Sequence, residues 1–258
     1  MGIKSTDEIK KRLHQRLAQH SIDPELLDSI VEQAMTVSYP AGAVIFLQGS
    51  SAEFLIWLLK GVVKVYCPIE GERILARLAG PGELLGQVNF LNGNGRRQLF
   101  EAHAASKCEV AVVSRDCILR IMEKLDKPEI VRLLDALNTM WSEVVFWYVT
   151  LLGLSYRTRL EMVLKDLASR FGVWEKRGML IIPELSQLDL AEMIGSSRPM
   201  VSRLVKEMTE RGELLRYNKK HIISDQAEWL RTDIMSGIFE PPNGKRPSPR
   251  LIVSNFAA

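Results

Sequence analysis

Residues 187–204, QLDLAEMIGSSRPMVSRL, carry the pattern of two helices joined by a tight turn. Ala191 is small enough for two helices to cross closely, and Gly195, four residues later, can adopt the left-handed conformation that ends a helix. Val201 and Leu204 recur at helical spacing and are expected to face the first helix. A small residue, a turn glycine and two apolar anchors at these offsets predict a helix-turn-helix rather than an ordinary helical hairpin.

The second helix of this unit has a well-marked beginning. Ser196 or Ser197 can cap it, and Pro199 lies in its first turn, where a missing N–H costs nothing. Arg198 and Arg203 are five residues apart and therefore lie on neighbouring turns. Each guanidinium can donate two hydrogen bonds to guanine O6 and N7 in the major groove of DNA, so this helix is the predicted base-reading element.

Residues 212–223 follow as strand, polar tip and strand, which is typical of a wing. Between residues 196 and 220 the chain has seven Lys/Arg and three Glu, a local net charge of +4. Such a stripe attracts the phosphate backbone, although a solvated helix face is the alternative on charge alone. The residues predicted to contact DNA are Ser197, Arg198, Pro199, Met200, Ser202, Arg203, Lys206, Lys219 and Lys220.

The N-terminal half has a different pattern. Residues 6–35 have the apolar spacing of short helices, and Pro40–Gly42 then marks a turn. From there to about residue 115, short apolar runs alternate with glycines, which predicts a small barrel or jelly roll. The expected strands are Val44–Leu47, Phe54–Leu59, Val62–Tyr66, Arg73–Leu78 and Cys108–Val113.

A long helix is predicted from about Pro128 to Gly153. One row of apolar residues holds a heptad spacing, which favours pairing with a twin helix. A second, adjacent row at Leu133, Met140, Trp147 and Leu154 is expected to lie against the jelly roll, and a single helix buried in one core is the alternative. The predicted dimer seam consists of Ile130, Leu134, Leu137, Trp141, Val144, Tyr148 and Leu151.

Composition excludes several classes of protein. The chain has 258 residues, a net charge of +3 and three scattered cysteines, which fit neither a disulfide framework nor a zinc site. No apolar run reaches the roughly 18 residues that a membrane span needs, and no signal peptide is evident, so a cytoplasmic location is expected. The tail from Ser236 is rich in proline and basic residues and is predicted to be disordered.

Together these features resemble the catabolite-activator/fumarate-nitrate-regulator (Crp/Fnr) superfamily of bacterial transcription regulators. The resemblance covers about residues 25–225 and rests on four motifs. These are Gly42…Gly49…Gly61, Gly80-Pro-Gly-Glu-Leu-Leu-Gly86, Leu154-Ser-Tyr-Arg-Thr-Arg-Leu160 and Gly195-Ser-Ser-Arg-Pro-Met-Val-Ser-Arg203.

The resemblance implies an α+β fold with four parts. They are N-terminal helices with a cyclic-nucleotide-binding-type β-roll (1–125), a dimerisation helix (126–155), a winged helix-turn-helix (156–235) and a tail (236–258). It further implies a homodimer that binds a pseudo-palindromic site on double-stranded DNA and acts with RNA polymerase. Several members have a base-reading Glu at the position of Pro199, so the target sequence is expected to differ from theirs.

The effector site departs from the cyclic-AMP-binding members. They have a ribose-binding Gly-Glu pair where this chain has Gly86-Gln87, and a phosphate-binding Arg-Ser pair where it has Arg96-Arg97-Gln98. Their adenine-contacting Thr-Ser pair corresponds to Val144-Val145. We therefore expect an effector other than cyclic AMP, such as a cyclic dinucleotide, or none. The residues expected to contact an effector are Gly86, Gln87, Val88, Arg96, Arg97, Val144 and Val145.

Several alternatives stay open at this point. Arg96 and Arg97 could form a solvated hairpin tip, and His103 or Cys67 could ligate haem or be structural. No cysteine precedes Cys67, so an iron–sulfur cluster is not expected. The alternative function is a ligand-binding interaction module with a vestigial helix-turn-helix. An enzyme is not expected, because the sequence contains no Ser/His/Asp arrangement, metal-ligand cluster or phosphate-binding loop.

Overall fold

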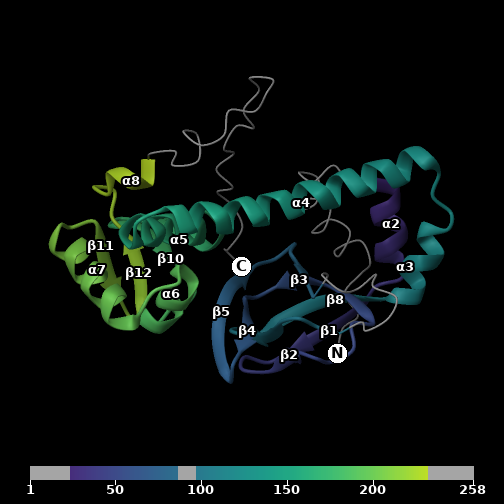
Figure 1. Cartoon of the computed structure of the whole chain (residues 1–258), viewed down its shortest axis with the longest axis horizontal. Coiled ribbons are helices and arrows are strands. Elements are labelled where there is room, and N and C mark those ends of the chain that lie inside the picture. The colour runs from purple at the N-terminus through teal and green to yellow at the C-terminus, as the bar shows by residue number, and fades with distance from the viewer. Residues whose placement is uncertain (1–23, 87–96, 232–258) are drawn as a thin grey trace. The chain divides into compact units, whose positions relative to one another are not determined.

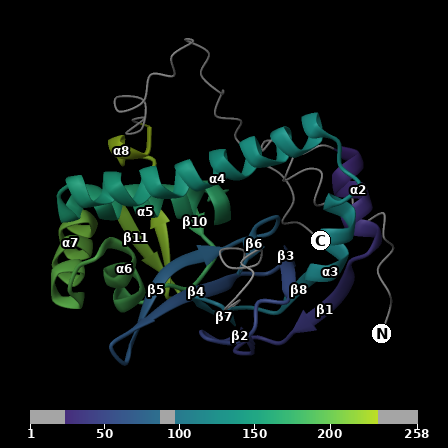
Figure 2. The same cartoon turned by 45° about the vertical axis from the view of Figure 1, so that its right-hand side comes forward.

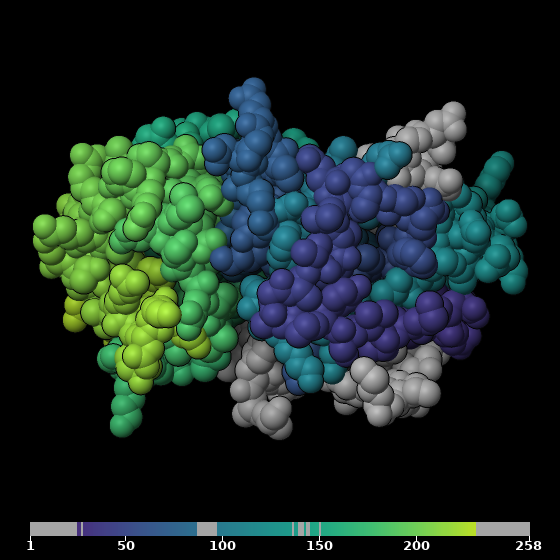
Figure 3. All heavy atoms as spheres, turned by 90° about the horizontal axis from the view of Figure 1, so that it is seen from below, coloured from purple at the N-terminus to yellow at the C-terminus, as the bar shows by residue number. Residues whose placement is uncertain are grey.

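The computed structural model describes residues 24–86 and 97–231. The chain divides into two compact units, with the boundary between Thr150 and Leu151. Figure 3 colours the N-terminal unit purple to teal and the C-terminal unit green to yellow. Among the described residues, no helix is both long enough and apolar enough to cross a membrane.

The N-terminal unit contains two antiparallel four-stranded sheets that enclose a core, as in the predicted jelly roll. Buried residues of this core come from both sheets, including Ile56 and Leu58 from one and Val63, Val65 and Ala102 from the other. The first sheet has the order β1 (Met35–Tyr39), β8 (Cys108–Ser114), β3 (Phe54–Lys60) and β6 (Leu84–Leu85). The second has the order β2 (Val44–Phe46), β7 (Glu101–Ala104), β4 (Val63–Ile69) and β5 (Glu72–Ala79).

Strand β3 is apolar on both faces because both are covered. Ile56 and Leu58 face the core between the sheets, whereas Trp57 and Leu59 pack with residues of helices α2 (Pro24–Glu32) and α3 (Arg115–Met122). Figures 1 and 2 show these two helices side by side next to the first sheet. This explains why the sequence of β3 shows a continuous apolar run instead of an alternating one.

The five expected strands all form, and helix α4 (Lys127–Gly153) begins one residue before its predicted start. Strands β1, β6 and β7 were not predicted. Met35 begins β1 instead of ending a helix, and β1 pairs along its whole length with β8. The expected helical residues 6–23 lie outside the described residues.

The C-terminal unit contains a four-stranded sheet of order β11-β12-β10-β9, against which helices α5 and α7 pack. Its buried residues include Leu160, Leu164, Leu190, Val201 and Met208. The hairpin β9–β10 was not predicted, and it makes the wing part of a larger sheet. The elements are α5 (Tyr156–Phe171), β9 (Gly172–Glu175), β10 (Gly178–Ile181), α6 (Gln187–Ile194), α7 (Arg198–Glu210), β11 (Leu214–Tyr217), β12 (Lys220–Ile223) and α8 (Glu228–Arg231).

Candidate nucleic-acid interface

Helix α6 begins and ends at residues that fix the helix-turn-helix. Ser186 accepts a hydrogen bond from Asp189 N at 3.0 Å, and Asp189 accepts one from Ser186 N at 2.8 Å, which together form a capping box. Gly195 ends the helix in the left-handed conformation, with φ 64° and ψ 45°. Ser196 N then donates to Ala191 O at 2.9 Å, which satisfies a carbonyl of the last turn.

Helix α7 begins at the second of the two serines that the sequence offered as caps. Ser197 is the N-cap residue and accepts a hydrogen bond from Met200 N, with Pro199 in the first turn. Val201 and Leu204 are buried, as is Met208 one turn further on. These three residues define the inner face of α7, which packs against α6.

The opposite face of α7 is exposed and polar. Ser202, Arg203 and Lys206 are exposed, as are Arg198 and Pro199 in the first turn. Arg203 Nη2 lies 3.0 Å from Met200 Sδ, which is a weak acceptor, and Lys206 Nζ lies 3.7 Å from Glu210. Both contacts are weak enough for the side chains to exchange them for a ligand.

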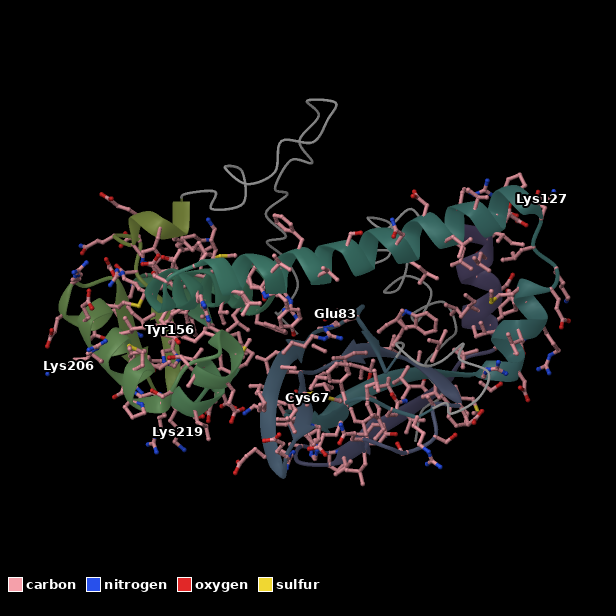
Figure 4. All side chains as sticks on the ribbon, viewed as in Figure 1. Cys67, Glu83, Lys127, Tyr156, Lys206 and Lys219 are labelled. Atoms are coloured by element: carbon pink, nitrogen blue, oxygen red, sulfur yellow. The ribbon has the colours of Figure 1, made fainter. Side chains whose placement is uncertain are left out.

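The wing is a tight hairpin that carries exposed cations. Tyr217 pairs with Lys220, and the two residues between them, Asn218 and Lys219, both have left-handed backbones with φ 46° and 65°. Lys219 is exposed, and Lys220 is half-buried. Figure 4 shows Lys219 and, on α7, Lys206 extending outward from the C-terminal unit. The predicted DNA contacts of α7 and the wing therefore lie on the exposed surface of one unit.

A shallow groove separates α7 from the wing. Its lining includes Ser202 and Lys206 of α7 and Arg216 and His221 of the wing. His221 is 3% exposed, and within the described residues its Nδ1 has no hydrogen-bond partner. Burial, with a smaller contribution from Arg216, lowers the pKa of His221 to about 4, so this histidine is neutral at pH 7.

Arg157 holds α7 and the wing against α5. Its guanidinium contacts Glu161 on α5 at 2.9 Å, Glu207 on α7 at 3.0 Å, and Glu213 before β11 at 2.6 Å. Because Arg157 is only 24% exposed, these bonds are better shielded than surface pairs. Arg157 therefore links α5, α7 and the start of the wing.

Arg159 connects the end of α4 to the turn of the helix-turn-helix. Its side chain donates to the carbonyls of Leu152 at 3.0 Å and Leu154 at 2.9 Å, and to that of Ile194 at 3.2 Å. Leu152 lies in the last turn of α4, Leu154 directly follows that helix, and Ile194 ends α6. The sequence contained Arg157 and Arg159 in a family motif but gave no indication of these partners.

The expected effector residues are only partly described. Gln87, Val88 and Arg96 lie outside the described residues, as does the side chain of Val144, whereas Val145 is 53% exposed. Gly86 has φ 71°, and a Cβ there would lie 2.5 Å from Oε1 of the buried Gln98. Arg97 Nη1 donates to Gly49 O at 2.7 Å. Thus the Arg97 side chain binds a backbone carbonyl, and the Gln98 side chain occupies the space beside Gly86.

Tyr148 of α4 contacts the roll at an irregular point of β5. Val65 pairs with Arg77 and Tyr66 with Leu75, so Ala76 is an extra residue, a β-bulge. The Tyr148 hydroxyl donates to Ala76 O at 3.4 Å. Burial raises the pKa of Tyr148 above its ordinary value, and the positive charge of Arg77 opposes this shift.

His103 and Cys67 belong to the same sheet as Ala76. His103 Nε2 accepts a hydrogen bond from Arg73 at 2.9 Å and lies 3.2 Å from Glu101. Cys67 is half-buried on β4. Among the described residues, no three His, Cys, Asp or Glu side chains are grouped so that they could hold a metal ion.

The predicted dimer seam of α4 differs in exposure along its length. Ile130 is 37%, Leu134 60% and Leu137 39% exposed. Leu151 is 5% exposed because it is buried within its own chain, so it is not available to a partner helix. Tyr148 is 41% exposed and contacts the roll as well. The side chains of Trp141 and Val144 lie outside the described residues.

Two family models match the chain. One describes a cyclic nucleotide-binding domain and matches residues 36–125, and the other describes a Crp-like helix-turn-helix domain and matches residues 152–232. Together they cover about two thirds of the chain. They coincide with the β-roll and with the unit that contains α6 and α7.

Curated relatives include regulators from several bacteria. A "CRP-like cAMP-activated global transcriptional regulator" of Mycobacterium tuberculosis is 25% identical over 220 residues, which are 81% of this chain and 93% of the relative. A "Global nitrogen regulator" of Synechococcus elongatus is 28% identical over 71% of this chain and 82% of the relative. The "Cyclic AMP receptor protein" of Thermus thermophilus is 29% identical over 75% of this chain and 85% of the relative.

Solved structures share the fold. The c-di-GMP-responsive global regulator CLP of Xanthomonas campestris matches with a TM-score of 0.65 and 20% identity, over 79% of this chain and all of that chain. A CRP-family transcriptional regulator of Thermus thermophilus matches with a TM-score of 0.62 and 21% identity, over 76% of this chain and 95% of that one.

Proposed function

Since the chain belongs to the Crp/Fnr superfamily of bacterial transcription regulators, we propose that it binds DNA sequence-specifically, as a homodimer on a pseudo-palindromic site. Double-stranded DNA, a second copy of the chain and RNA polymerase are its proposed partners. Each subunit would place one α7 helix in the major groove, so that the two half-sites are related by the two-fold axis of the dimer.

The observation that carries this proposal is the division of α7 into two faces. Val201, Leu204 and Met208 are buried, and Arg203 and Lys206 project from the other side. Arg203, with Arg198 on the preceding turn, would read guanine through bidentate hydrogen bonds. Lys206, Lys219 and Lys220 would contact phosphates, which position the protein without reading sequence.

The first turn of α7 suits close approach to DNA. Ser197 and Pro199 expose no bulky charged group there, and Met200 and Ser202 can make short contacts with base edges or phosphates. Proline cannot accept a hydrogen bond from cytosine N4, so the target would not depend on a carboxylate at this position.

We further propose that any effector differs from cyclic AMP, although the relatives from Mycobacterium tuberculosis and Thermus thermophilus are named for that ligand. The residues that support this are Gln87 in place of a carboxylate and the paired valines Val144 and Val145. A nucleotide bound there would leave polar groups without partners, at a cost of about 1–3 kcal/mol each. Titration of the dimer with cyclic AMP and with cyclic di-GMP, followed by calorimetry, tests both nucleotides.

Helix α4 is the proposed carrier of the signal. Tyr148 contacts the roll at Ala76, and the end of the same helix is bound by Arg159, which also binds the turn of the helix-turn-helix. A shift of α4 at the effector site would therefore alter the arrangement of the two α7 helices, as a change in population between two dimer geometries. A ligand that binds without changing DNA affinity would contradict this mechanism, since linkage is reciprocal.

In-vitro selection of random DNA by the purified protein tests the proposed function. The expected product is a two-fold-symmetric motif whose enrichment depends on Arg203. If wild type and Arg203→Ala retain every sequence equally at fixed salt, sequence-specific regulation is wrong.

A further inference from the structure

The most exposed apolar residues of α4 lie one position after alternate members of the predicted seam, and the remaining members of that seam belong to the same row. Val131 is 63%, Val145 53% and Leu152 73% exposed, whereas their predecessors in the sequence are 37% exposed at Ile130 and 5% exposed at Leu151. Residues 131, 138, 145 and 152 recur every seven residues and form the a positions of a heptad. Leu134 and Tyr148, both exposed, are d positions of the same heptad, and Trp141 falls at the intervening d position.

One a position of this row is polar. Asn138 is exposed and lies one heptad before Val145. With Ser142, Val145 and Val149 it lines a shallow hollow on the outer side of α4. The row is therefore apolar at both ends and has an amide near its middle.

We propose that Asn138 sets the register and the partner of the α4 homodimer, by pairing with Asn138 of a second copy. This inference rests on the homodimer of the proposed function and names the residue that makes it specific. A parallel, in-register pair of α4 helices places the two residues opposite each other across the two-fold axis. An amide has both a donor and an acceptor, so two of them satisfy each other.

A second copy fits this row better than any apolar occupant. An apolar helix would bury Asn138 without a partner, and an antiparallel or shifted pair would place it opposite Leu134 or Val145. A buried amide without a hydrogen bond is costly, whereas a single Asn at an a position selects register and oligomeric state at some cost in stability. Asn138 therefore destabilises antiparallel and shifted pairs of α4 more than it stabilises the parallel, in-register dimer.

Subunit exchange between wild type and Asn138→Leu tests the inference. The two chains carry different affinity tags, are mixed, denatured and refolded together, and are then resolved by native mass spectrometry. Random pairing gives homodimers and heterodimers in a 1:2:1 ratio. We expect the heterodimer to be depleted about tenfold, because it buries an amide against leucine. We also expect the Asn138→Leu homodimer to dissociate more slowly than the wild type or to form higher oligomers.

Val145→Leu is the matched control, because it alters the next a position but removes no amide. Its heterodimer with the wild type should form in the random ratio. A wild-type dimer that mixes with Asn138→Leu in the random ratio overturns the role of Asn138 and leaves the homodimer standing. A wild-type chain that remains monomeric at micromolar concentration overturns the homodimer itself, and this inference with it.

Discussion

Arg159 donates a hydrogen bond from Nη1 to the carbonyl oxygen of Ile194, 3.2 Å away, and so joins the start of α5 to the last turn of α6. Its other nitrogens bind the carbonyls of Leu152 in the last turn of α4 and of Leu154 directly after it. One guanidinium therefore satisfies carbonyl groups of two helix ends that have no intrahelical partners. Any displacement of the end of α4 acts directly on the turn that aims α7.

Replacing Arg159 by lysine should loosen this connection. The ammonium group keeps the charge, but it cannot span three carbonyls, so we expect a loss of about 1–3 kcal/mol of stability. Hydrogen exchange should become faster at residues 151–156 and 194–198. Arg170→Lys on the same helix is the control, since Arg170 pairs with Asp166 of its own helix and should lose less than about 0.5 kcal/mol. Equal exchange in both variants would refute the connection.

Arg203→Ala and Lys206→Ala should weaken DNA binding in different ways. Loss of a bidentate contact to guanine costs about 1–3 kcal/mol of discrimination, so Arg203→Ala should lower affinity for the selected site and spare random DNA. Lys206→Ala should lower affinity for both and reduce the salt slope by about 1. Fluorescence anisotropy across a salt series measures both effects. If the two variants behaved alike, the assignment of one residue to bases and the other to phosphates would fail.

Lys219→Gly should lower DNA affinity without lowering the stability of the folded chain. Lys219 has a left-handed backbone, which costs a side-chain-bearing residue about 1 kcal/mol and glycine almost nothing. Part of that gain is offset by the greater freedom of glycine in the unfolded chain, so we expect a stability change of between zero and about 1 kcal/mol in favour of the variant. DNA affinity should nevertheless fall, because a phosphate contact is lost.

Lys219→Ala is the matched control for this change. It removes the charge but keeps the strained conformation, so its DNA affinity should fall equally without any gain in stability. Thermal unfolding and salt-dependent binding of the two variants decide the matter. If Lys219 contacts no phosphate, the DNA affinity of both variants should equal that of the wild type.

Acid should destabilise the C-terminal unit through His221. The pKa of this histidine is about 4 in the folded chain and about 6.5 when unfolded, so the unfolded state binds the proton more readily. The stability that neutral His221 contributes is complete above pH 6.5 and is lost as the pH falls toward 4, by up to about 3 kcal/mol. Pulse proteolysis in urea at pH 7.5 and pH 5 should show about 2 kcal/mol of this loss.

His221→Leu should remove the acid sensitivity of this region. Since Nδ1 has no hydrogen-bond partner in the described residues, an apolar replacement costs no bond there, and stability at pH 7.5 should be maintained. A variant with the same loss of stability between pH 7.5 and pH 5 as the wild type would show that other groups cause it.

Local signals made the helix-turn-helix predictable. The turn at Gly195, the cap at Ser197 and the first-turn Pro199 act within a few residues of one another, and the structure confirms all three. Hairpin β9–β10 was missed because its determinants are distant. A Cβ at Gly178 would lie 2.1 Å from Ile223 O, a contact that exists only once β12 has paired with β10.

The partners of α4 were harder to predict than the helix itself. Its two apolar rows are adjacent, and periodicity alone cannot say which row faces the roll and which faces outward. The structure buries Leu151, a member of the predicted seam, and exposes Leu152, which belongs to neither predicted row. The partners of Arg157 and Arg159 could not be predicted either. Those of Arg157 lie up to 56 residues away, and those of Arg159 are backbone carbonyls, which every residue has.

Because Ala76 is an extra residue in β5, the burial of this strand's leucines depends on the number of its residues as well as on their types. Leu75 and Leu78 are both fully buried although they are three residues apart, a separation that puts side chains on opposite sides of an uninterrupted strand. The irregular pairing at Ala76 returns them to the same side. Deleting Ala76 would remove the bulge and place Leu75 and Leu78 on opposite sides of the strand, so this segment can accept substitutions far more readily than a change in residue number.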